Sequence, residues 1–368
     1  MPNERKMQIQ IKKEDDSMRR YVIFILVIFS LFMSGCFENI ISEVRYESTP
    51  ISLEYKISYG YYINSSGKGD FNVNYTCFVP QPINGYISNL SVIGNYSYND
   101  LKIGSNRIIT WSFDENGRKN IKIGIEVSVK TNAFLVDLDS TKYLDIKNIS
   151  MDIKRKYCRD QSIENKTLIQ PSDLEIKNLA YSLKISDNAF EVAKSIFEWL
   201  KENTNYVYHP QQSLPQSAKE TLNLKSGDCD DLSILYISLC RAVGIPSRLV
   251  RGYLIEEKNG KYIATPHAWA EIYVGFGKDG WIPVECAGIS KDIEAEVHQN
   301  FGIEDAFHLR LFVDNGTNES LALSSRGVRV RYEEGLKIEM KPFVEVSDVS
   351  IGNYGSLVVR KDGRRFYS

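Results

Sequence analysis

The segment SGDCDDLSILYISLCRAVGIPSR, residues 226–248, constrains the fold more than any other stretch of the chain. Asp228 is a typical helix N-cap, and Gly244 followed closely by a proline is a typical helix stop. Between these two positions apolar residues fall on almost every face of the helix, which is typical of a helix buried at the centre of a domain. The sequence therefore predicts a central helix that runs to about Val243 and carries Cys229 in its first turn.

Cys229 is the first candidate for chemistry. A thiol at a helix N-terminus lies at the positive end of the helix dipole and beside unpaired backbone N–H groups, and both favour the thiolate. The same N–H groups can hold an oxyanion. A buried structural cysteine is the alternative for any lone cysteine, so the position of Cys229 alone does not indicate catalysis.

A histidine further along the chain changes that interpretation. In TPHAWAEIYV, His267 lies on one face of a predicted strand, and small or apolar residues occupy the other face. The turn GFGKDG leads into WIPVE, which returns antiparallel and ends at Glu285. His267 and Glu285 are therefore expected toward the same end of one hairpin, where a base and the carboxylate that orients it can meet. No second motif surrounds the remaining histidines, which we interpret as structural or surface groups: His209, His298 and His308.

The flanking segments predict a mixed architecture. Residues 45–135 alternate apolar and polar positions in short stretches separated by turn residues, a pattern typical of a β-sandwich. The segment NAFEVAKSIFEWLKEN, residues 188–203, predicts a helix with Asp187 as its N-cap. The segment 289–368 is expected to hold further strands and a short helix near 291–300.

Three separate motifs carry a resemblance to a known family. The spans GDCDDLSILYISLCRAVGIPSRLVRGYL, HAWAEIYV and GWIPVE resemble the core of the transglutaminase-like superfamily, whose members share the papain-like cysteine protease fold. The resemblance covers roughly residues 175–290, and the N-terminal strands resemble the β-domain that precedes this core in many bacterial and archaeal members. The whole chain is similar to a mostly archaeal branch of the family. One departure is present: the family usually has aspartate where this chain has Glu285, and proline where it has Cys286.

These observations predict an α+β fold with a papain-like transglutaminase core, preceded by an all-β, sandwich-like domain. The expected units are a signal, lipoprotein or membrane-anchor segment at 1–36, the β-sandwich-like domain at 45–150, the core at 170–290 and a C-terminal β-rich extension at 291–368.

The resemblance also implies a reaction, which is acyl transfer on peptide or carboxamide bonds through a thioester. Cys229 is then the nucleophile, His267 the general base, and Glu285 the group that orients the imidazole. Water as acceptor would make the protein a protease or amidase, which we expect because nothing in the sequence indicates that water is excluded. An amine as acceptor would make it a protein-crosslinking transglutaminase, and a non-catalytic adhesion or scaffold module is the remaining alternative. No metal or organic cofactor is required, and the expected partner is a protein or peptide substrate, including one of the cell envelope.

The N-terminus indicates attachment to a membrane. Residues 21–33, YVIFILVIFSLFM, form an apolar run between Arg19-Arg20 and Ser34-Gly35-Cys36. A basic flank, an apolar stretch and small residues are typical of a signal peptide, and Cys36 resembles the lipid-modified cysteine of secreted lipoproteins. An uncleaved membrane anchor is the alternative, and a buried core helix is the least favoured one. The first two readings place the bulk of the chain outside the cell, anchored to the cell membrane.

Asn-x-Ser/Thr sequons support that location as a group, although single matches are weak. The candidate N-glycosylation sites are Asn64, Asn74, Asn89, Asn95, Asn148, Asn165, Asn315 and Asn318.

Composition excludes some classes of function. The net charge of −2 gives no case for a nucleic-acid partner. The sequence contains no CxxC pair and no HExxH motif, so a zinc site of either kind is not expected. Cys240 lies in an apolar stretch and is interpreted as a buried small hydrophobe, whereas disulfides among the other cysteines are left open.

Overall fold

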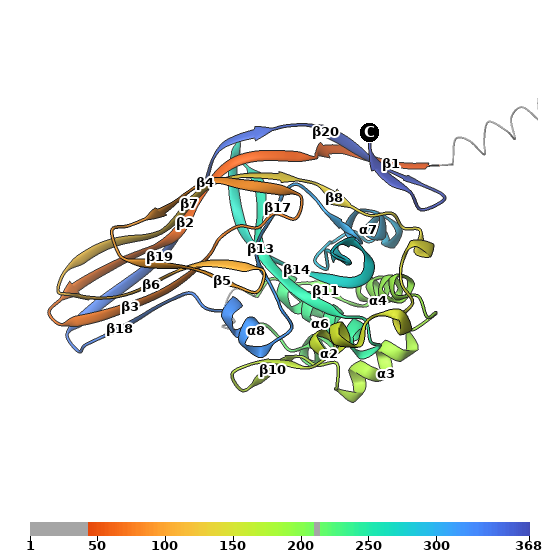
Figure 1. The fold of residues 1–368 in the computed structure, drawn as a ribbon, viewed down its shortest axis with the longest axis horizontal. Helices are drawn as coiled ribbons and strands as arrows, with labels where there is room; N and C mark the ends of the chain where they lie inside the picture. The colour runs from red at the N-terminus through yellow and green to blue at the C-terminus, as the bar shows by residue number, and fades with distance from the viewer. Residues whose placement is uncertain (1–42, 210–213) are drawn as a thin grey trace, which may run out of the picture.

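The computed structural model describes residues 43–209 and 214–368. The apolar run 21–33 and Cys36 therefore lie outside the described residues. The described chain combines a β-sandwich with a helical core, and a narrow three-stranded sheet runs along one side of both (Figure 1). Among the described helices, none is both long enough and apolar enough to cross a membrane.

Two four-stranded antiparallel sheets form the sandwich. Their strands alternate buried and more exposed residues, as in β3 (Asp70–Phe78), where Phe71, Val73, Tyr75 and Cys77 are buried. The inward residues of both sheets share one hydrophobic core. One sheet has the order β18 (Val328–Tyr332), β3, β6 (Asn106–Asn116), β5 (Tyr98–Ile103), and the other β19 (Leu336–Ile351), β2 (Ser52–Gly67), β7 (Lys119–Asn132), β4 (Gly85–Ile93).

The C-terminal part of the chain supplies an edge strand to each of these sheets. β18 pairs with β3, and β19 pairs with β2 from Leu336 to Ile351. Strands of the segment 291–368 therefore belong to the same sandwich as the strands of 52–132, because antiparallel edges can be completed by any segment that returns to them.

The second unit is built around α6 (Cys229–Ala242), in which every residue from Asp231 to Arg241 is buried. The helix packs against a four-stranded antiparallel sheet, which has small residues such as Ala268 and Ala270 at the contact. Its order is β15 (Trp281–Val284), β14 (Lys261–Lys278), β13 (Ser247–Lys258), β17 (His308–Val313). Three further helices surround α6: α3 (Leu174–Ser182), α4 (Ala189–Asn203) and α5 (Ala218–Leu224).

The predicted helix at 188–203 is α4, but Asp187 is not its N-cap. The side chain of Asn188 accepts hydrogen bonds from the N–H groups of Phe190 and Glu191 and caps the helix instead. Asp187 forms an ion pair with Lys184 at 2.9 Å. Either residue type can cap a helix, so the backbone path before α4 decided between the two.

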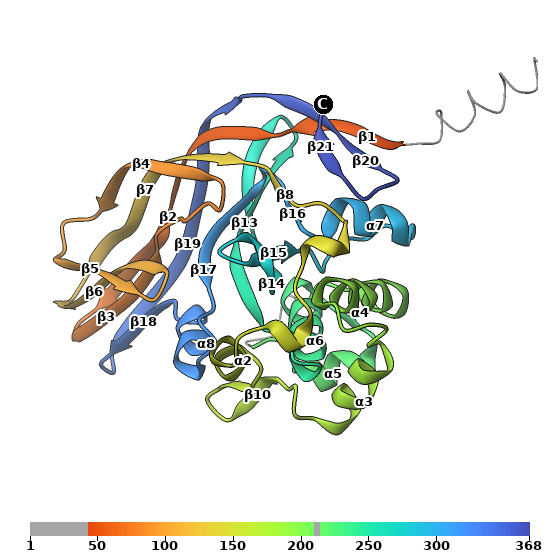
Figure 2. The same ribbon diagram turned by 45° about the vertical axis from the view of Figure 1, so that its right-hand side comes forward.

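The three-stranded sheet consists of β1 (Glu43–Pro50), β20 (Tyr354–Arg360) and β21 (Arg365–Tyr367), and it lies over α7 (Ile293–Asn300), as Figure 2 shows. β1 was expected within the sandwich but pairs with β20. The buried guanidinium of Arg365 donates to the carbonyl oxygens of Val136 and His298 and so connects this sheet to the core.

The remaining elements are β8 (Phe134–Leu135), η1 (Ser140–Lys142), η2 (Ile146–Asn148), α2 (Met151–Tyr157), β9 (Gln161–Ile163), β10 (Lys166–Ile169), β11 (Asn205–Tyr206), β12 (Ser226–Gly227), β16 (Ile303–Glu304) and α8 (Asn318–Ser324).

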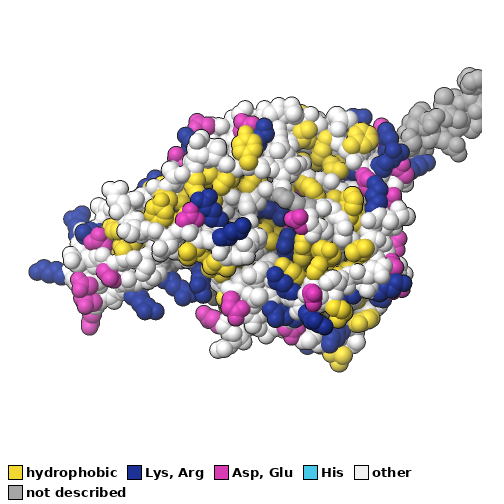
Figure 3. Space-filling view, in the orientation of Figure 1, with side chains coloured by type: hydrophobic (Ala, Val, Ile, Leu, Met, Phe, Trp, Pro, Cys, Tyr) yellow, Lys and Arg dark blue, Asp and Glu magenta, His cyan; other side chains and the backbone are white. Residues whose placement is uncertain are grey.

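The sandwich and the core are joined by shared strands. Ile255 of β13 and Leu309 of β17 are buried in the hydrophobic core of the sandwich, whereas Leu249 of β13 is buried in the core around α6. Two strands therefore run from one unit into the other, and the N-terminus of α6 lies close to this junction. The face in Figure 3 carries scattered charged side chains of both signs and no continuous surface of one sign.

Candidate active site

The N-terminus of α6 is held by a reciprocal capping box. The carboxylate of Asp228 accepts the N–H groups of Asp230 at 3.1 Å and Asp231 at 3.4 Å, and the carboxylate of Asp231 accepts the N–H of Asp228 at 3.1 Å. Asp231 also accepts the N–H of Gln216 at 2.7 Å. Cys229 is thus fixed in the first turn and partly exposed, with its own N–H left as the first-turn group that can face an oxyanion.

The hairpin of β14 and β15 brings His267 and Glu285 together. Ala270 lies opposite Val284, and the same register places Glu285, which follows directly after β15, opposite Trp269 and two residues from His267. His267 Nε2 lies 2.7 Å from Glu285 Oε2. Burial by itself lowers the pKa of His267, but the Glu285 carboxylate and a hydrogen bond with the Cys229 side chain outweigh it and raise that pKa. Because Nε2 is engaged by Glu285, Nδ1 is the ring atom left for the thiol.

Glu285 is held at both carboxylate oxygens. The N–H of Ala287 donates to Oε1 at 2.6 Å, and Oε2 accepts from His267 and also faces His308 Nε2 at 3.1 Å. Burial raises the pKa of Glu285, but the two imidazoles outweigh it and hold the pKa well below its ordinary value. Glu285 is therefore an anion that faces His267.

His308, which the sequence led us to interpret as a structural or surface group because no second motif surrounds it, lies beside the predicted site residues. His308 lies on β17, and His267 lies on β14; in the sheet, β13 lies between these two strands. The ring centroids of the two histidines are 5.4 Å apart. Asp305 Oδ1 lies 2.6 Å from His308 Nδ1. Sequence reasoning missed this pair because strand order within the sheet places it. The only local signal was an acid three residues before a histidine in EDAFHL.

Of the other two histidines, His298 lies on α7 and its Nδ1 is 2.8 Å from the hydroxyl of Tyr46, outside the site. Burial raises the pKa of the Asp228 carboxyl, and the nearby His209 offsets that rise only in part. Glu271, on the same strand as His267, is occupied elsewhere, since Arg248 lies 2.6 Å from Oε2 and Arg310 2.6 Å from Oε1.

A cavity of about 370 Å³ lies over Cys229 and His267. One wall is apolar and includes Phe78 of β3 in the sandwich. Another part is polar, where the guanidinium of Arg251 donates to Asp230 at 2.8 Å. Further lining residues come from the loop after β11, from β13, β14 and β17 and from the end of α8: Tyr208, Tyr253, Pro266, Leu311, Phe312 and Ser324.

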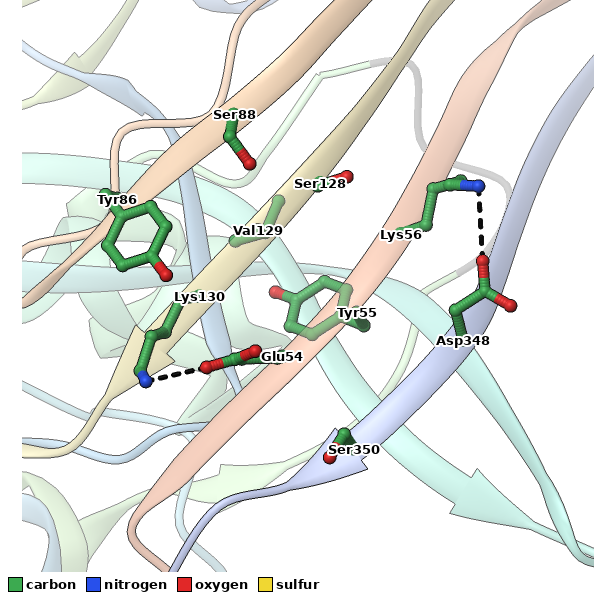
Figure 4. Close-up of a pocket in the computed structure, with 10 residues that line it drawn as sticks. All are labelled: Glu54, Tyr55, Lys56, Tyr86, Ser88, Ser128, Val129, Lys130, Asp348 and Ser350. Atoms are coloured by element: carbon green, nitrogen blue, oxygen red, sulfur yellow. Dashed lines mark hydrogen bonds and ion pairs between the residues drawn. The ribbon is translucent and has the colours of Figure 1, made fainter.

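A second hollow, on the outer face of the β19-β2-β7-β4 sheet, has no comparable chemistry (Figure 4). Its charged groups neutralise one another, because Lys130 pairs with Glu54 at 2.6 Å and Lys56 with Asp348 at 3.2 Å. Three serines, two tyrosines and a valine complete the lining, and neither a cysteine nor a histidine is among the lining residues. The cavity over Cys229 is therefore the candidate site.

His267, Glu285 and His308 also form a set of potential metal ligands, since their donor atoms lie within 4.8 Å of one another. Two histidines and a carboxylate suit zinc or iron. Here, however, both Nε2 atoms face the same oxygen, Glu285 Oε2, at hydrogen-bonding distance. Hydrogen bonding accounts for the arrangement without an ion.

The five cysteines in the described residues are all free thiols: Cys77, Cys158, Cys229, Cys240 and Cys286. Cys240 is fully buried, as predicted. The sequon asparagines are exposed except Asn315, which is half-buried, so the structure leaves most of these candidate sites accessible.

The sequence matches the model of the transglutaminase-like superfamily at residues 177–286. Residues 177–286 form a transglutaminase-like domain. The matched range contains α6, the β14–β15 hairpin and all three predicted site residues, Cys229, His267 and Glu285.

The described fold resembles a solved structure called a "putative cysteine protease" from Cytophaga hutchinsonii. The TM-score is 0.53 at 17% identity, over 81% of this chain and 93% of that one. This likeness concerns the fold, and it extends beyond the transglutaminase-like domain, because the aligned share exceeds the 177–286 range.

Two bacterial proteins are similar in sequence. "Uncharacterized protein YebA" of Bacillus subtilis is 27% identical over 150 residues, which are 36% of this chain and 20% of that protein. An "Uncharacterized protein" of Haemophilus influenzae is 26% identical over 270 residues, which are 65% of this chain and 69% of that protein. The chain thus spans about a fifth of the length of the Bacillus protein. The affinity to an archaeal branch stays a prediction.

Proposed function

We propose that this protein is a cysteine acyl-transfer enzyme that cleaves peptide or carboxamide bonds through a thioester. The observation that carries the proposal is the 2.7 Å contact between His267 and Glu285 beside the thiol of Cys229, in a cavity open to a substrate. A base held by a carboxylate and facing a nucleophile at a helix N-terminus is the arrangement that activates a thiol.

In the first half of the reaction, Cys229 Sγ attacks the carbonyl carbon of the substrate. His267 Nδ1 takes the thiol proton, and the imidazolium is stabilised by Glu285. The negative charge that develops on the carbonyl oxygen faces the N-terminus of α6, where the N–H of Cys229 can donate to it. The carbon–nitrogen bond then breaks, the leaving amine takes the proton from His267, and an acyl thioester remains on Cys229.

In the second half, water attacks the thioester carbonyl and gives up a proton to His267. The carbon–sulfur bond breaks, the carboxylic acid leaves, and the sulfur regains its proton. A primary amine in place of water would yield a new amide, which is the transglutaminase outcome. We propose hydrolysis as the main fate, because water is always present at the partly exposed thiol whereas an amine needs a binding site of its own.

We also propose that the chain works outside the cell, attached by its N-terminus to the cell membrane. This proposal rests on the apolar run 21–33 and on the sequence Ser34-Gly35-Cys36. Replacement of Cys36 by alanine is expected to leave an unprocessed precursor with altered release from the membrane. A mature mass unchanged by that substitution would favour an uncleaved anchor.

Incubation of the purified protein with peptide libraries, with and without an added primary amine, tests the proposed reaction. New carboxyl termini are expected in the wild type and are expected to be lost in Cys229→Ala and His267→Ala. Amide products with the added amine would identify a transglutaminase. If the protein is folded by circular dichroism but gives no thiol-dependent product in either condition, a non-catalytic adhesion or scaffold module would be favoured.

A further inference from the structure

Behind His267 and Glu285 lie two ionisable groups, His308 and Asp305, that the proposed reaction does not use directly. His308 Nδ1 is 2.6 Å from Asp305 Oδ1, and His308 Nε2 is 3.1 Å from Glu285 Oε2. The side chain of His308 is 9% exposed. A carboxylate can only accept hydrogen bonds, so each ring nitrogen that faces one must carry a hydrogen. His308 is therefore an imidazolium held between two carboxylates.

Glu285 needs such a partner more than an aspartate would. Its side chain has one more rotatable bond, and holding it in one conformation costs more conformational entropy. The N–H of Ala287 fixes Oε1 at 2.6 Å, and His308 fixes Oε2, the same oxygen that faces His267. With both oxygens held, the carboxylate presents one geometry to the imidazole of His267.

We propose that His308, held by Asp305, is a positioning residue that keeps the Glu285 carboxylate against His267 and, through its positive charge, sets the upper pH limit of the reaction. This inference rests on the proposed function. His308 is not among the residues that line the cavity over Cys229, so it acts through Glu285 and, as a charge, on His267.

The charges around His308 define the expected pH effect. Its neighbours are Asp305 from its own turn, Glu285 after β15 and His267 on β14, with the Trp269 ring 5.0 Å away. Tyr367 on β21 lies near Asp305, but burial raises the pKa of Tyr367 to about 12, so it stays neutral. His308 is thus the second cation beside one carboxylate, and as a like charge it opposes protonation of His267.

Two substitutions test the role of this charge in the full-length protein. His308→Gln keeps a donor toward Glu285 but removes the charge. Asp305→Asn removes the anion that holds His308 protonated, while its Oδ1 can still accept from His308 and from the N–H of Phe307. His298→Gln is the matched control, because that histidine is also poorly exposed, has a carboxylate neighbour and lies outside the site.

The readouts are kcat and KM for a peptide cleaved by the wild type, and the rate of alkylation of Cys229 by iodoacetamide as a function of pH. His308→Gln is expected to lower kcat by about 10–100-fold with little change in KM, by analogy with the loss of a side chain that hydrogen-bonds a metal ligand. The descending limb of its kcat/KM profile is expected at higher pH, because His267 no longer faces a second cation. Asp305→Asn is expected to lower kcat and to shift the descending limb to higher pH, each by less than His308→Gln does. His298→Gln is expected to match the wild type in both.

An unchanged kcat and an unchanged descending limb in a folded His308→Gln protein would overturn the inference. If His308→Gln does not fold, the same result in Asp305→Asn overturns it, because that variant keeps the volume and the acceptor. Failure of the proposed function is distinguishable: Cys229 of the wild type would then show no preferential alkylation, and Cys229→Ala would cleave peptides as the wild type does.

Discussion

At the residue scale, burial disfavours the thiolate at the four cysteines of the described chain other than Cys229. Cys77, Cys240 and Cys286 are at most 2% exposed, and Cys158 is half-buried, as Cys229 is. Burial raises the pKa of Cys158 to about 11 and that of Cys77 and Cys240 to about 12, and it also raises the pKa of Cys286. These four thiols are protonated at neutral pH and therefore poor nucleophiles.

Limited alkylation with iodoacetamide at neutral pH is accordingly expected to modify Cys229 first, with the modified position identified by mass spectrometry. Cys229→Ser, which removes only the sulfur, is expected to abolish the fast phase. Labelling of Cys77, Cys158 or Cys286 at an equal or higher rate in the folded protein would contradict the assignment of Cys229 as the nucleophile.

A second prediction at this scale concerns the length of the Glu285 side chain. Glu285→Gln keeps the shape but loses the charge, and activity is expected to fall by about 10²–10⁴-fold, the scale seen when an orienting acid is neutralised. Glu285→Asp restores the family's residue but withdraws the carboxylate by about 1.5 Å, one carbon–carbon bond. Because His267, His308 and the N–H of Ala287 are all placed for the longer side chain, we expect Glu285→Asp to be impaired as well. Full activity of Glu285→Asp in the same kcat/KM assay would mean that the backbone after β15 adjusts to the shorter side chain.

The buried ionisable groups also predict a pH window for stability. The pKa of Glu285 is lowered from 4.5, so the stabilisation it contributes is present above that pH and is lost as pH falls through its folded pKa. The pKa of His308 is raised from 6.5, so its contribution is present below that pH and is lost as pH rises through its folded pKa. Both contributions are present between the two ordinary pKa values, 4.5 and 6.5. The free energy of unfolding in urea is therefore expected to be highest in this range, to fall at lower pH as Glu285 is protonated and to fall at higher pH as His308 loses its proton. His308→Gln should reduce the decline on the alkaline side; an identical alkaline slope would show that other groups cause it.

At the element scale, the capping of α6 links stability to the proposed chemistry. The Asp228 carboxylate holds two N–H groups of the first turn on which Cys229 lies. Asp228→Ala is expected to cost about 0.5–2 kcal/mol of unfolding free energy, the usual range for a lost N-cap, and also to slow alkylation of Cys229 because the first turn frays. Asp292→Ala removes the N-cap of α7 and is the matched control. It is expected to lower stability similarly while Cys229 alkylates at the wild-type rate, and equal slowing in both variants would show a global effect instead.

At the scale of the whole molecule, the two sheets of the sandwich depend on the end of the chain. A chain that stops after Arg326 lacks β18 and β19 and leaves β3 and β2 as uncovered edges. Unpaired edges with an open core favour aggregation, so this truncated protein is expected to be insoluble or to lose its cooperative unfolding transition. A chain that stops after Ile351 keeps both sheets and lacks only β20 and β21; it is expected to stay soluble, with a lower melting temperature by calorimetry. Normal cooperative unfolding of the shorter protein would contradict the dependence of the sandwich on its C-terminal strands.

The local elements of this protein could be predicted from sequence because short-range physics decides them. The all-round apolar pattern and Asp228 define α6, and the alternation around His267 with its tight turn defines the hairpin that carries Glu285. Contacts within one hairpin follow from its register, so the approach of His267 to Glu285 was open to prediction. The choice between Asp187 and Asn188 as N-cap was not, because neighbouring capping residues differ by too little free energy.

The sequence by itself determined where a cysteine meets a helix N-terminus and which histidine and acid share a hairpin, since those relations span a few turns or two adjacent strands. Only the tertiary structure decided that His308 and Asp305 lie behind Glu285, that β18 and β19 complete the sandwich, and that β1 leaves the sandwich to pair with β20. The physical reason is that the order of strands in a sheet depends on long-range packing. Any strand with a suitable apolar face can pair with an open sheet edge. Which strand pairs there is decided by the packing free energy of the whole core, not by the residues adjacent to that strand in sequence.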